Sequence, residues 1–301
     1  MWRDSGWFMK DQNASAVGFM LVATAFIAGT MLMAKLLGSD ALGPALHPLQ
    51  VSHGRFVFAF AAILSTVAIM RPAIKAPRWR LHIGRTLFGW AGVSLMFAAV
   101  AFIPLPDATA ISFLNPVFGM LLAIPLLGEK VGKWRWLAAA IALTGAMILL
   151  RPGPQTFQVA ALLALGAAVL LGMELIFIKR LTRGEGPLQI LLINNTLGLC
   201  IASIAVVAFW MAPTPLQWAA LAALGVMMAA AQACFVNAMA RADASFVTPF
   251  SYVTLIFAAL YDFAAFGAVP DNVSLIGAVV ILAGAALLAW REALQVKPEI
   301  S

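Results

Sequence analysis

The sequence predicts an all-α integral membrane protein with ten transmembrane helices, arranged as two inverted five-helix repeats. Three observations lead to this prediction. Of the 301 residues, 63% are hydrophobic and only 10% are charged, whereas a soluble domain carries about 25% charged residues. Charges, prolines and polar clusters divide the chain into ten apolar runs. Landmarks of the first half recur in the second half at a nearly constant offset.

The ten runs are long enough to cross a bilayer, which requires about 20 apolar residues for a hydrocarbon core of about 30 Å. In chain order, we place the spans at residues 14–37, 49–70, 83–103, 107–127, 134–151, 157–178, 188–210, 217–240, 245–267 and 274–290. The first run exceeds the core of a signal peptide, which has about 7–15 apolar residues, so we count it as a helix. The predicted organisation is a segment 1–13, a first repeat 14–151, a second repeat 157–290 and a tail 291–301.

The positions of lysine and arginine predict the orientation, because these residues concentrate on the cytoplasmic side of membrane proteins. With the N-terminus in the cytoplasm, 16 of the 19 basic residues fall on that side. They are Arg3, Lys10, Arg71, Lys75, Arg78, Arg80, Arg85, Lys130, Lys133, Arg135, Lys179, Arg180, Arg183, Arg241, Arg291 and Lys297. We therefore expect a multi-pass protein of the bacterial cytoplasmic (inner) membrane with both termini cytoplasmic. A nucleic-acid site would instead need basic residues clustered on one face, so we expect no nucleic-acid partner.

An internal repeat connects the two halves. Pro48-Leu49-Gln50 recurs in the second half as Pro187-Leu188-Gln189, and Gly145 and Gly284 are separated by the same offset in residue number. Because five is an odd number, the second half enters the membrane from the opposite side. Inverted repeats of this kind suit alternating access, in which two similar halves exchange conformations.

Several motifs connect the chain with a known family. The first half contains Pro106-Asp107-Ala108-Thr109-Ala110, Asn115-Pro116-Val117-Phe118 and Leu127-Gly128-Glu129, and the second half contains Thr248-Pro249-Phe250-Ser251-Tyr252. With them, the chain resembles the drug/metabolite transporter superfamily, specifically its EamA-type ten-helix branch, over nearly its whole length. The second-half motif is similar to a subgroup of S-adenosylmethionine and riboflavin importers. The resemblance implies a central cavity between the halves and no ATP-binding domain. Gly267-Ala268 departs from the Gly-Glu that is common in the family.

Ionisable residues at membrane depth are costly and usually face protein or a water-filled cavity. Arg55 lies about six residues into the second predicted span, where it either anchors an anionic group of a substrate or makes a structural ion pair. Its counterpart in the repeat is Asn194, which keeps the polarity without the charge. Glu174 either binds a cationic group, takes up a proton or pairs with a nearby basic residue. Lys35 lies near a helix end, where its side chain can snorkel to the headgroups.

Pro116 and Pro249 each remove one helical hydrogen bond, from the carbonyls of Ser112 and Ser245 respectively. Helix breaks at matching positions of two halves are typical of transporter binding sites. The remaining candidates for substrate binding are Trp90, Ser112, Asn115, Gln232, Asn237 and Tyr252. Trp90 and Tyr252 are alternatively packing aromatics, and Asn237 is alternatively a hydrogen-bonding contact to a neighbouring helix.

Together these patterns favour a secondary transporter of a small organic metabolite that is amino-acid-like, nucleoside-like or vitamin-like. We expect it to work in membrane lipid without a cofactor, as a monomer or homodimer, driven by a gradient or by exchange. The alternatives are a channel or lipid scramblase and, less favoured, a membrane-embedded enzyme. The chain contains no H-E-x-x-H zinc motif, no G-x-S-x-G nucleophile turn and no P-loop, so the usual signatures of those enzymes and of ATP drive are absent.

Overall fold

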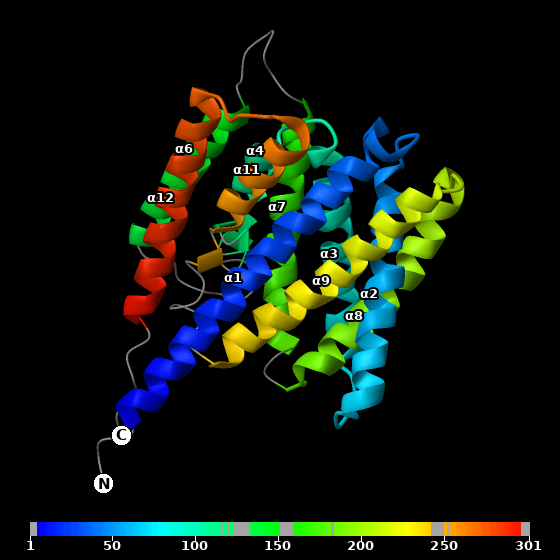
Figure 1. Ribbon diagram of the computed structural model, residues 1–301. Coiled ribbons are helices and arrows are strands. Elements are labelled where there is room, and N and C mark those ends of the chain that lie inside the picture. The colour runs from blue at the N-terminus through cyan, green and yellow to red at the C-terminus, as the bar shows by residue number, and fades with distance from the viewer. Residues whose placement is uncertain are drawn as a thin grey trace.

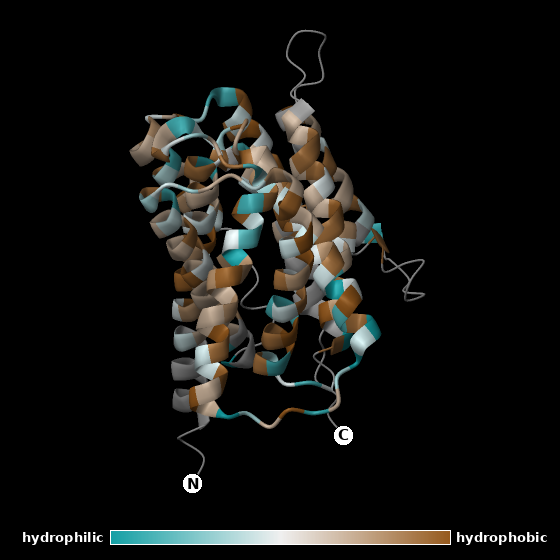
Figure 2. Cartoon of the chain, turned by 90° about the vertical axis from the view of Figure 1, so that its right-hand side faces the viewer, coloured by the Kyte–Doolittle hydropathy of each residue, from teal (hydrophilic) through white to brown (hydrophobic). Residues whose placement is uncertain are grey.

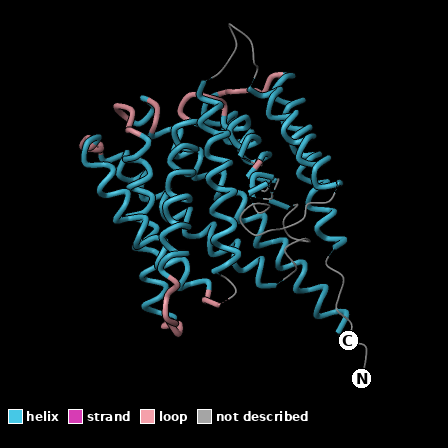
Figure 3. Tube along the Cα trace, turned by 180° about the vertical axis from the view of Figure 1, so that it is seen from behind, coloured by secondary structure: helices cyan, strands magenta, loops and turns pink. Residues whose placement is uncertain are grey.

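The computed structural model describes residues 5–112, 114–115, 117–119, 121–122, 133–150, 159–181, 184–241, 250–251 and 253–295. The regular secondary structure of this part of the chain is helical, with no strand (Figure 3). Six of its helices are long and apolar enough to cross a membrane, and three shorter helices are also apolar. Large hydrophobic side chains lie exposed along them, among them Phe102, Ile204 and Val207, each at least 75% exposed. Figure 2 shows hydrophobic residues along the length of the helices. A lipid environment accounts for this surface, because water would not tolerate so large an apolar area.

The ten described α-helices come in the expected order, although α1 begins at Ser5, nine residues before its expected span at 14–37. They are α1 (Ser5–Leu37), α2 (Pro48–Met70), α3 (Trp79–Val100), α4 (Leu105–Ser112), α6 (Lys133–Leu150), α7 (Val159–Leu181), α8 (Pro187–Val206), α9 (Pro215–Arg241), α11 (Val253–Phe266) and α12 (Asn272–Gln295). Two short 3-10 helices follow α1 and α8, at Asp40–Leu42 and Val207–Phe209. Proline opens α2, α8 and α9, where its fixed φ suits the first helical turn and its missing N–H costs nothing.

One expected span differs clearly from the structure. We expected a continuous helix over 107–127, but α4 ends at Ser112, Leu114 lies in a turn, and residues 115, 117–119 and 121–122 are again helical. A proline deprives the carbonyl four residues before it of its helical partner, so an end of α4 at Ser112 is the physical effect expected of Pro116. Pro116 and Pro249 themselves lie outside the described residues.

Eight of the described helices form a closed ring in which each packs against the next. The order around the ring is α1, α9, α2, α8, α3, α7, α4 and α11, which returns to α1. The helices α6 and α12 pack side by side outside this ring and reach it mainly through α4 (Figure 1). Neighbours in the ring are far apart in the sequence, so the ring can close only after both halves of the chain are present.

The strongest helix pairings are kept when each helix of the first half is exchanged with its counterpart in the second. The exchange turns the α1–α9 contact into α7–α3, the α2–α9 contact into α8–α3, and the α1–α11 contact into α7–α4. The pairs α2–α8, α4–α11 and α6–α12 are their own images. The weaker α2–α3 and α4–α12 contacts have no image of comparable extent among the described helices. The main pairings are those that two similar five-helix units would make.

The α6–α12 pair depends on two glycines that occupy equivalent positions in the two repeats. A Cβ atom on Gly145 would lie 2.6 Å from the amide nitrogen of Ile281, and one on Gly284 would lie 2.6 Å from that of Ala142. Each glycine therefore lets the backbone of its own helix touch the backbone of the other helix. Small residues allow such close approach of membrane helices.

A polar network closes the end of the molecule where α2 stops and α3 begins. The Glu185 carboxylate lies in the connection between α7 and α8. It accepts hydrogen bonds from the Arg78 backbone N–H at 3.0 Å and from Gln189 Nε2 at 2.7 Å, and its Oε2 lies 2.7 Å from Nε2 of His82. Burial alone would raise the pKa of Glu185, but the hydrogen bonds to His82 and Arg78 outweigh it and hold that pKa below its ordinary value of 4.5.

This network predicts an acid-sensitive contribution to stability. Because the pKa of Glu185 is lower in the folded protein, its stabilisation is complete above the ordinary value and is lost as the pH falls through the folded-state pKa. We expect the melting temperature of the detergent-solubilised wild type to fall more steeply between about pH 5 and pH 3 than that of Glu185→Gln. Asp40→Asn, at an exposed acid of the opposite end, is the control and should follow the wild-type slope. Identical slopes for wild type and Glu185→Gln would contradict the assignment.

Candidate functional site

Three charged residues from three helices meet at membrane depth. They are Arg55 on α2, Arg85 on α3 and Glu174 on α7, and the two arginines are 3% and 5% exposed. The Arg85 Nε and Glu174 Oε1 atoms are 3.5 Å apart. Glu174 also lies within electrostatic reach of Arg55. The cluster thus holds two positive charges and one negative charge where water is scarce.

Arg85 has structural partners on two neighbouring helices. Its Nη1 donates a hydrogen bond to the carbonyl of Ile190 on α8, at 3.1 Å. Its Nε faces Glu174 on α7 as an ion pair without the geometry of a hydrogen bond. Arg85 therefore braces α3 against both α7 and α8 and compensates the charge of Glu174.

Arg55 differs from Arg85 in having an unsatisfied donor. Its Nε is buried and has no hydrogen-bond partner among the described residues. The guanidinium instead lies over the ring of Phe56, 3.8 Å from the ring centroid. A buried N–H without an acceptor is costly, so an anionic or electron-rich ligand atom placed here would gain a charge-assisted hydrogen bond.

Glu174 packs against α3 at a glycine. A Cβ atom on Gly89 would lie 2.7 to 2.9 Å from the carboxylate carbon and both carboxylate oxygens. The absent side chain at position 89 is therefore what allows the Glu174 carboxylate to lie beside Arg85. Gly89 is a positioning residue for this charge.

Gly89→Ala is expected to displace the Glu174 carboxylate and loosen its pair with Arg85. We expect a loss of ligand binding comparable to that of Glu174→Gln, with a drop in stability of about 1–3 kcal/mol from the forced overlap. Binding and thermal unfolding should be measured on both variants. Gly166→Ala is the matched control, because its Cβ would meet only one side-chain atom, at 3.3 Å. Wild-type binding by Gly89→Ala would contradict the positioning role.

Several neutral polar groups lie on α3 and on two other helices of the ring, α8 and α9. The Thr86 hydroxyl donates to Oδ1 of Asn194 at 3.2 Å, which joins α3 to α8. Trp90 Nε1 on α3 and Gln232 Oε1 on α9 are buried and have no hydrogen-bond partner among the described residues. The ring thus carries both an unpaired donor and an unpaired acceptor besides Arg55.

The structure brings together only some of the candidates that the sequence predicts. Arg55 and Glu174 share one charged cluster, and Asn194 joins the neighbouring α3 through Thr86. Ser112 lies at the end of α4, where its hydroxyl donates to the Thr109 carbonyl of its own helix at 2.6 Å. Asn115 lies beside α7, with its carbonyl oxygen 2.8 Å from the place where a Cβ of Gly172 would be. Tyr252 lies outside the described residues.

One sequence-based interpretation needs correction. Asn237 makes no hydrogen bond across to another helix among the described residues: it donates to the Ala233 carbonyl at 2.9 Å and accepts from Arg241 at 2.6 Å, both on α9. Residues four apart lie on the same face of a helix, so these local partners satisfy the amide. Arg85, which the sequence analysis counted only among the basic residues of the cytoplasmic side, is buried in the second turn of α3.

The sequence analysis also missed a buried carboxylate. Asp262 on α11 is fully buried and makes an ion pair with Lys35 on α1. Its second oxygen accepts from the backbone N–H of Leu105 at 3.1 Å, at the start of α4. The expectation that Lys35 snorkels to the headgroups is therefore wrong: its side chain is only 14% exposed and turns toward Asp262. The signal that could have revealed this pair was an acidic residue, Asp262, inside the ninth apolar run.

Comparison with known proteins shows a family and individual proteins to which the whole sequence is similar. The sequence matches the EamA-like transporter family over residues 14–151 and 158–290. It is 26% identical over 277 residues to the S-adenosylmethionine uptake transporter of Rickettsia bellii (strain RML369-C), an alignment that covers 92% of this chain and 94% of that protein.

Two further comparisons extend this result. The chain is 33% identical over 245 residues to the riboflavin transporter of Rhizobium johnstonii (strain DSM 114642 / LMG 32736 / 3841), covering 78% of this chain and 79% of that protein. It also has the fold of a protein of known crystal structure, with a TM-score of 0.62 and 20% sequence identity over 90% of this chain and 98% of the other.

Proposed function

The chain belongs to the EamA-like transporter family, and from this premise we propose that it is a secondary transporter that moves a small organic metabolite across the cytoplasmic membrane by alternating access. The observation that carries the proposal is the buried charged cluster inside the ring of helices. Arg55 supplies a guanidinium with an unpaired Nε, and Glu174 supplies a carboxylate whose partner, Arg85, holds it without a hydrogen bond. Polar groups of this kind at membrane depth mark substrate pathways.

The substrate is an amino-acid-like, nucleoside-like or vitamin-like molecule that presents an anionic or electron-rich group to Arg55. Glu174, Asn194, Gln232 and Trp90 complete the polar lining, and Trp90 offers a flat face to a ring. The family relatives that carry S-adenosylmethionine and riboflavin support this range. Such a site uses a few placed polar groups in a largely apolar surround, as small-molecule sites generally do.

The alternating-access mechanism draws support from the packing. The main helix contacts are exchanged between the two halves, as an inverted repeat would require; we place the first repeat at 14–151 and the second at 157–290. Two similar halves that exchange conformations would expose one central site to each side of the membrane in turn.

Counterflow in proteoliposomes tests the proposal. Purified protein is reconstituted, and a labelled panel of S-adenosylmethionine, riboflavin, amino acids and nucleosides is offered outside, with and without the same unlabelled compound inside. A carrier takes up its labelled substrate faster when the unlabelled compound is inside. An uptake rate that is the same with and without the internal compound would support a channel. If fluorescent lipid from the inner leaflet becomes accessible to external dithionite, that result would support a scramblase.

We further propose that both termini are cytoplasmic, on the basis of the 16 basic residues that fall on one side. Single cysteines at Ser39 and Lys75, introduced after removal of Cys200 and Cys234, test this orientation. An impermeant thiol reagent applied to intact cells is expected to label position 39 and to spare position 75. The reverse pattern would refute the orientation.

A further inference from the structure

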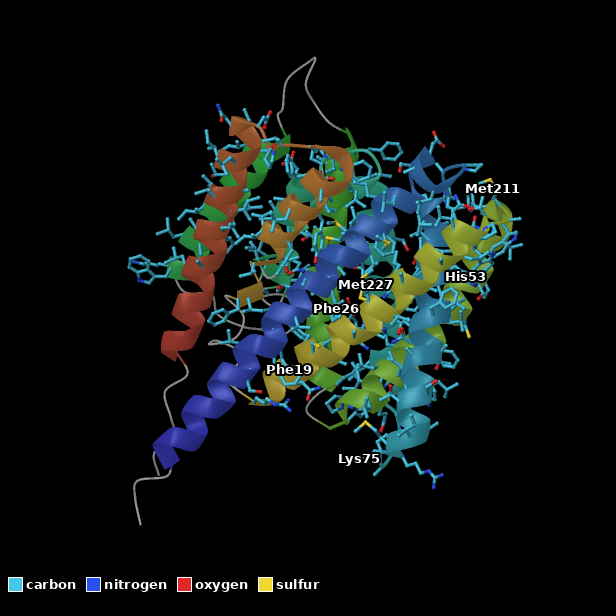
Figure 4. The ribbon with its side chains drawn as sticks, viewed as in Figure 1. Phe19, Phe26, His53, Lys75, Met211 and Met227 are labelled. Carbon is cyan, nitrogen blue, oxygen red and sulfur yellow. The ribbon has the colours of Figure 1, made fainter. Side chains whose placement is uncertain are left out.

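Two glutamines at opposite ends of the molecule make the same contact. Gln50 at the start of α2 donates through Nε2 to the Met211 carbonyl and accepts from the Met211 N–H at 3.1 Å. Gln189 at the start of α8 donates to the Lys75 carbonyl at 3.1 Å and accepts from the Lys75 N–H at 2.8 Å. Each side-chain amide thus clamps both polar groups of one backbone residue. Figure 4 places Met211 and Lys75 at opposite ends of the molecule.

The two clamps are images of one another under the repeat. Gln50 and Gln189 each end the Pro-Leu-Gln tripeptide that opens the second helix of their own half. Each holds a loop of the other half: Met211 lies between α8 and α9, and Lys75 lies between α2 and α3. Both amides are almost fully buried, with 1% and 3% of the residue exposed. Breaking either clamp would leave a buried side-chain amide without its backbone partners, which is costly.

Between these ends, α2 lies in direct contact with α8 and α9. A Cβ atom on Gly225 of α9 would lie 2.9 Å from the Ala59 nitrogen and 3.0 Å from the Arg55 carbonyl oxygen. Gly198 of α8 lies directly against the ring of Phe56. We call α2, α8 and α9 with their two clamps the clamped wall. It is held at both ends and in the middle.

The opposite side of the ring is built differently. There the described α4 has 8 residues before the turn at Leu114, and the described α11 has 14 residues. At the Gln50 end, side chains hold this region together. Asp262 joins α11 to Lys35 of α1 and to the Leu105 N–H of α4, and the Ser274 hydroxyl of α12 donates to Asp107 of α4 at 3.0 Å.

From this contrast we infer that the clamped wall is the fixed hinge of the transport cycle, and that the Lys35–Asp262 contact is the gate at one end of the opposite side. When two bodies rotate about a line, displacement is smallest at that line and largest at the far side. The inference rests on the alternating-access mechanism proposed above. The Lys35–Asp262 contact joins two side chains, of which the lysine is 14% exposed, whereas each clamp binds a side-chain amide to the backbone of the other half.

Distances between spin labels test the inference without knowledge of the substrate. In a chain with Cys200→Ala and Cys234→Ala in lipid nanodiscs, one pair of labels spans the gate, at Ala41 and Val269. Two control pairs span the clamped wall, at Ala45 with Ala212 and at Ala73 with Gly186; all six positions are exposed. Each pair is measured with the native gate and with Lys35→Met/Asp262→Leu, which removes both charges together.

We expect the gate pair to gain a population about 5 Å or more longer in the neutral variant, while both wall pairs stay within about 2 Å of their native distances. A wall pair that moves as far as the gate pair would overturn the hinge. A gate pair with the same distances in both proteins would overturn the gate. Because no substrate is present, failure here is distinguishable from failure of counterflow.

Hydrogen exchange of the unmodified chain provides a second measurement that does not depend on any variant. Amides of 105–112 and 253–266 are expected to exchange about tenfold faster than those of 48–70 and 187–206, since opening occurs on their side of the ring. The opposite order would overturn the hinge whether or not the neutral variant folds.

Discussion

Arg55→Lys is expected to weaken substrate binding about tenfold to a hundredfold, with little change in folded yield. Lysine keeps the positive charge near Glu174 but loses the planar fork that presents several N–H donors. The donor that has no partner among the described residues, the Arg55 Nε, is among those lost. Lysine also cannot stack flat on Phe56 as the guanidinium does. Affinity for the substrate found by counterflow and thermal stability in detergent should be measured on the same preparation.

Arg85→Lys is the matched control for this prediction. The donors of Arg85 face the Ile190 carbonyl and Glu174. Replacement of Arg85 should therefore lower the free energy of unfolding at least as much as it lowers the free energy of substrate binding. Arg55→Gln gives the decisive comparison. A well-folded Arg55→Gln protein with unchanged affinity would exclude Arg55 from substrate binding, and a loss of folded yield alone would assign it to a structural ion pair.

Asp262→Asn is expected to destabilise the protein by about 3 kcal/mol, because it leaves the Lys35 ammonium in a mostly buried place without its counter-ion. Lys35→Met/Asp262→Leu should recover much of this loss, since removal of both charges leaves no buried charge unpaired and only the Leu105 N–H loses its acceptor. Thermal unfolding of Lys35→Met, Asp262→Leu and the double variant gives the coupling energy. If the Asp262→Asn protein is as stable as the wild type, the ion pair does not stabilise the fold.

The helices could be predicted from sequence because each rests on local information, namely a long apolar run bounded by charge or proline. Pro48 and Pro187 marked helix starts for the same reason. The interruption after Ser112 was harder to place: a proline signals a lost hydrogen bond, but whether a helix bends or stops depends on the helices packed around it. In this case α4 stops.

The candidate site could be predicted only in part. Arg55 was recognisable because it lies deep within an apolar run. Arg85 lies close to the edge of its predicted span and was counted only among the basic residues of the cytoplasmic side, yet its long side chain reaches Glu174. Asp262 and Leu105 are 157 residues apart, and only the closed ring brings them together. Pairing across such separations is a property of the tertiary packing and leaves no local pattern.

The close packing of α6 against α12 at Gly145 and Gly284 also constrains how the protein is made. Gly284 follows Gly145 only after roughly 140 further residues, and at about 5–20 residues per second this delay is roughly 7–28 s. During that time the glycine face of α6 can meet only lipid or an assembly factor. Small residues leave a groove that acyl chains fill poorly. The Gly145 face of α6 therefore stays uncovered in the nascent chain until α12 is made. Biogenesis therefore ends with the last helix, and a chain truncated before α12 should be recognised by membrane quality control although the helices before it are already inserted.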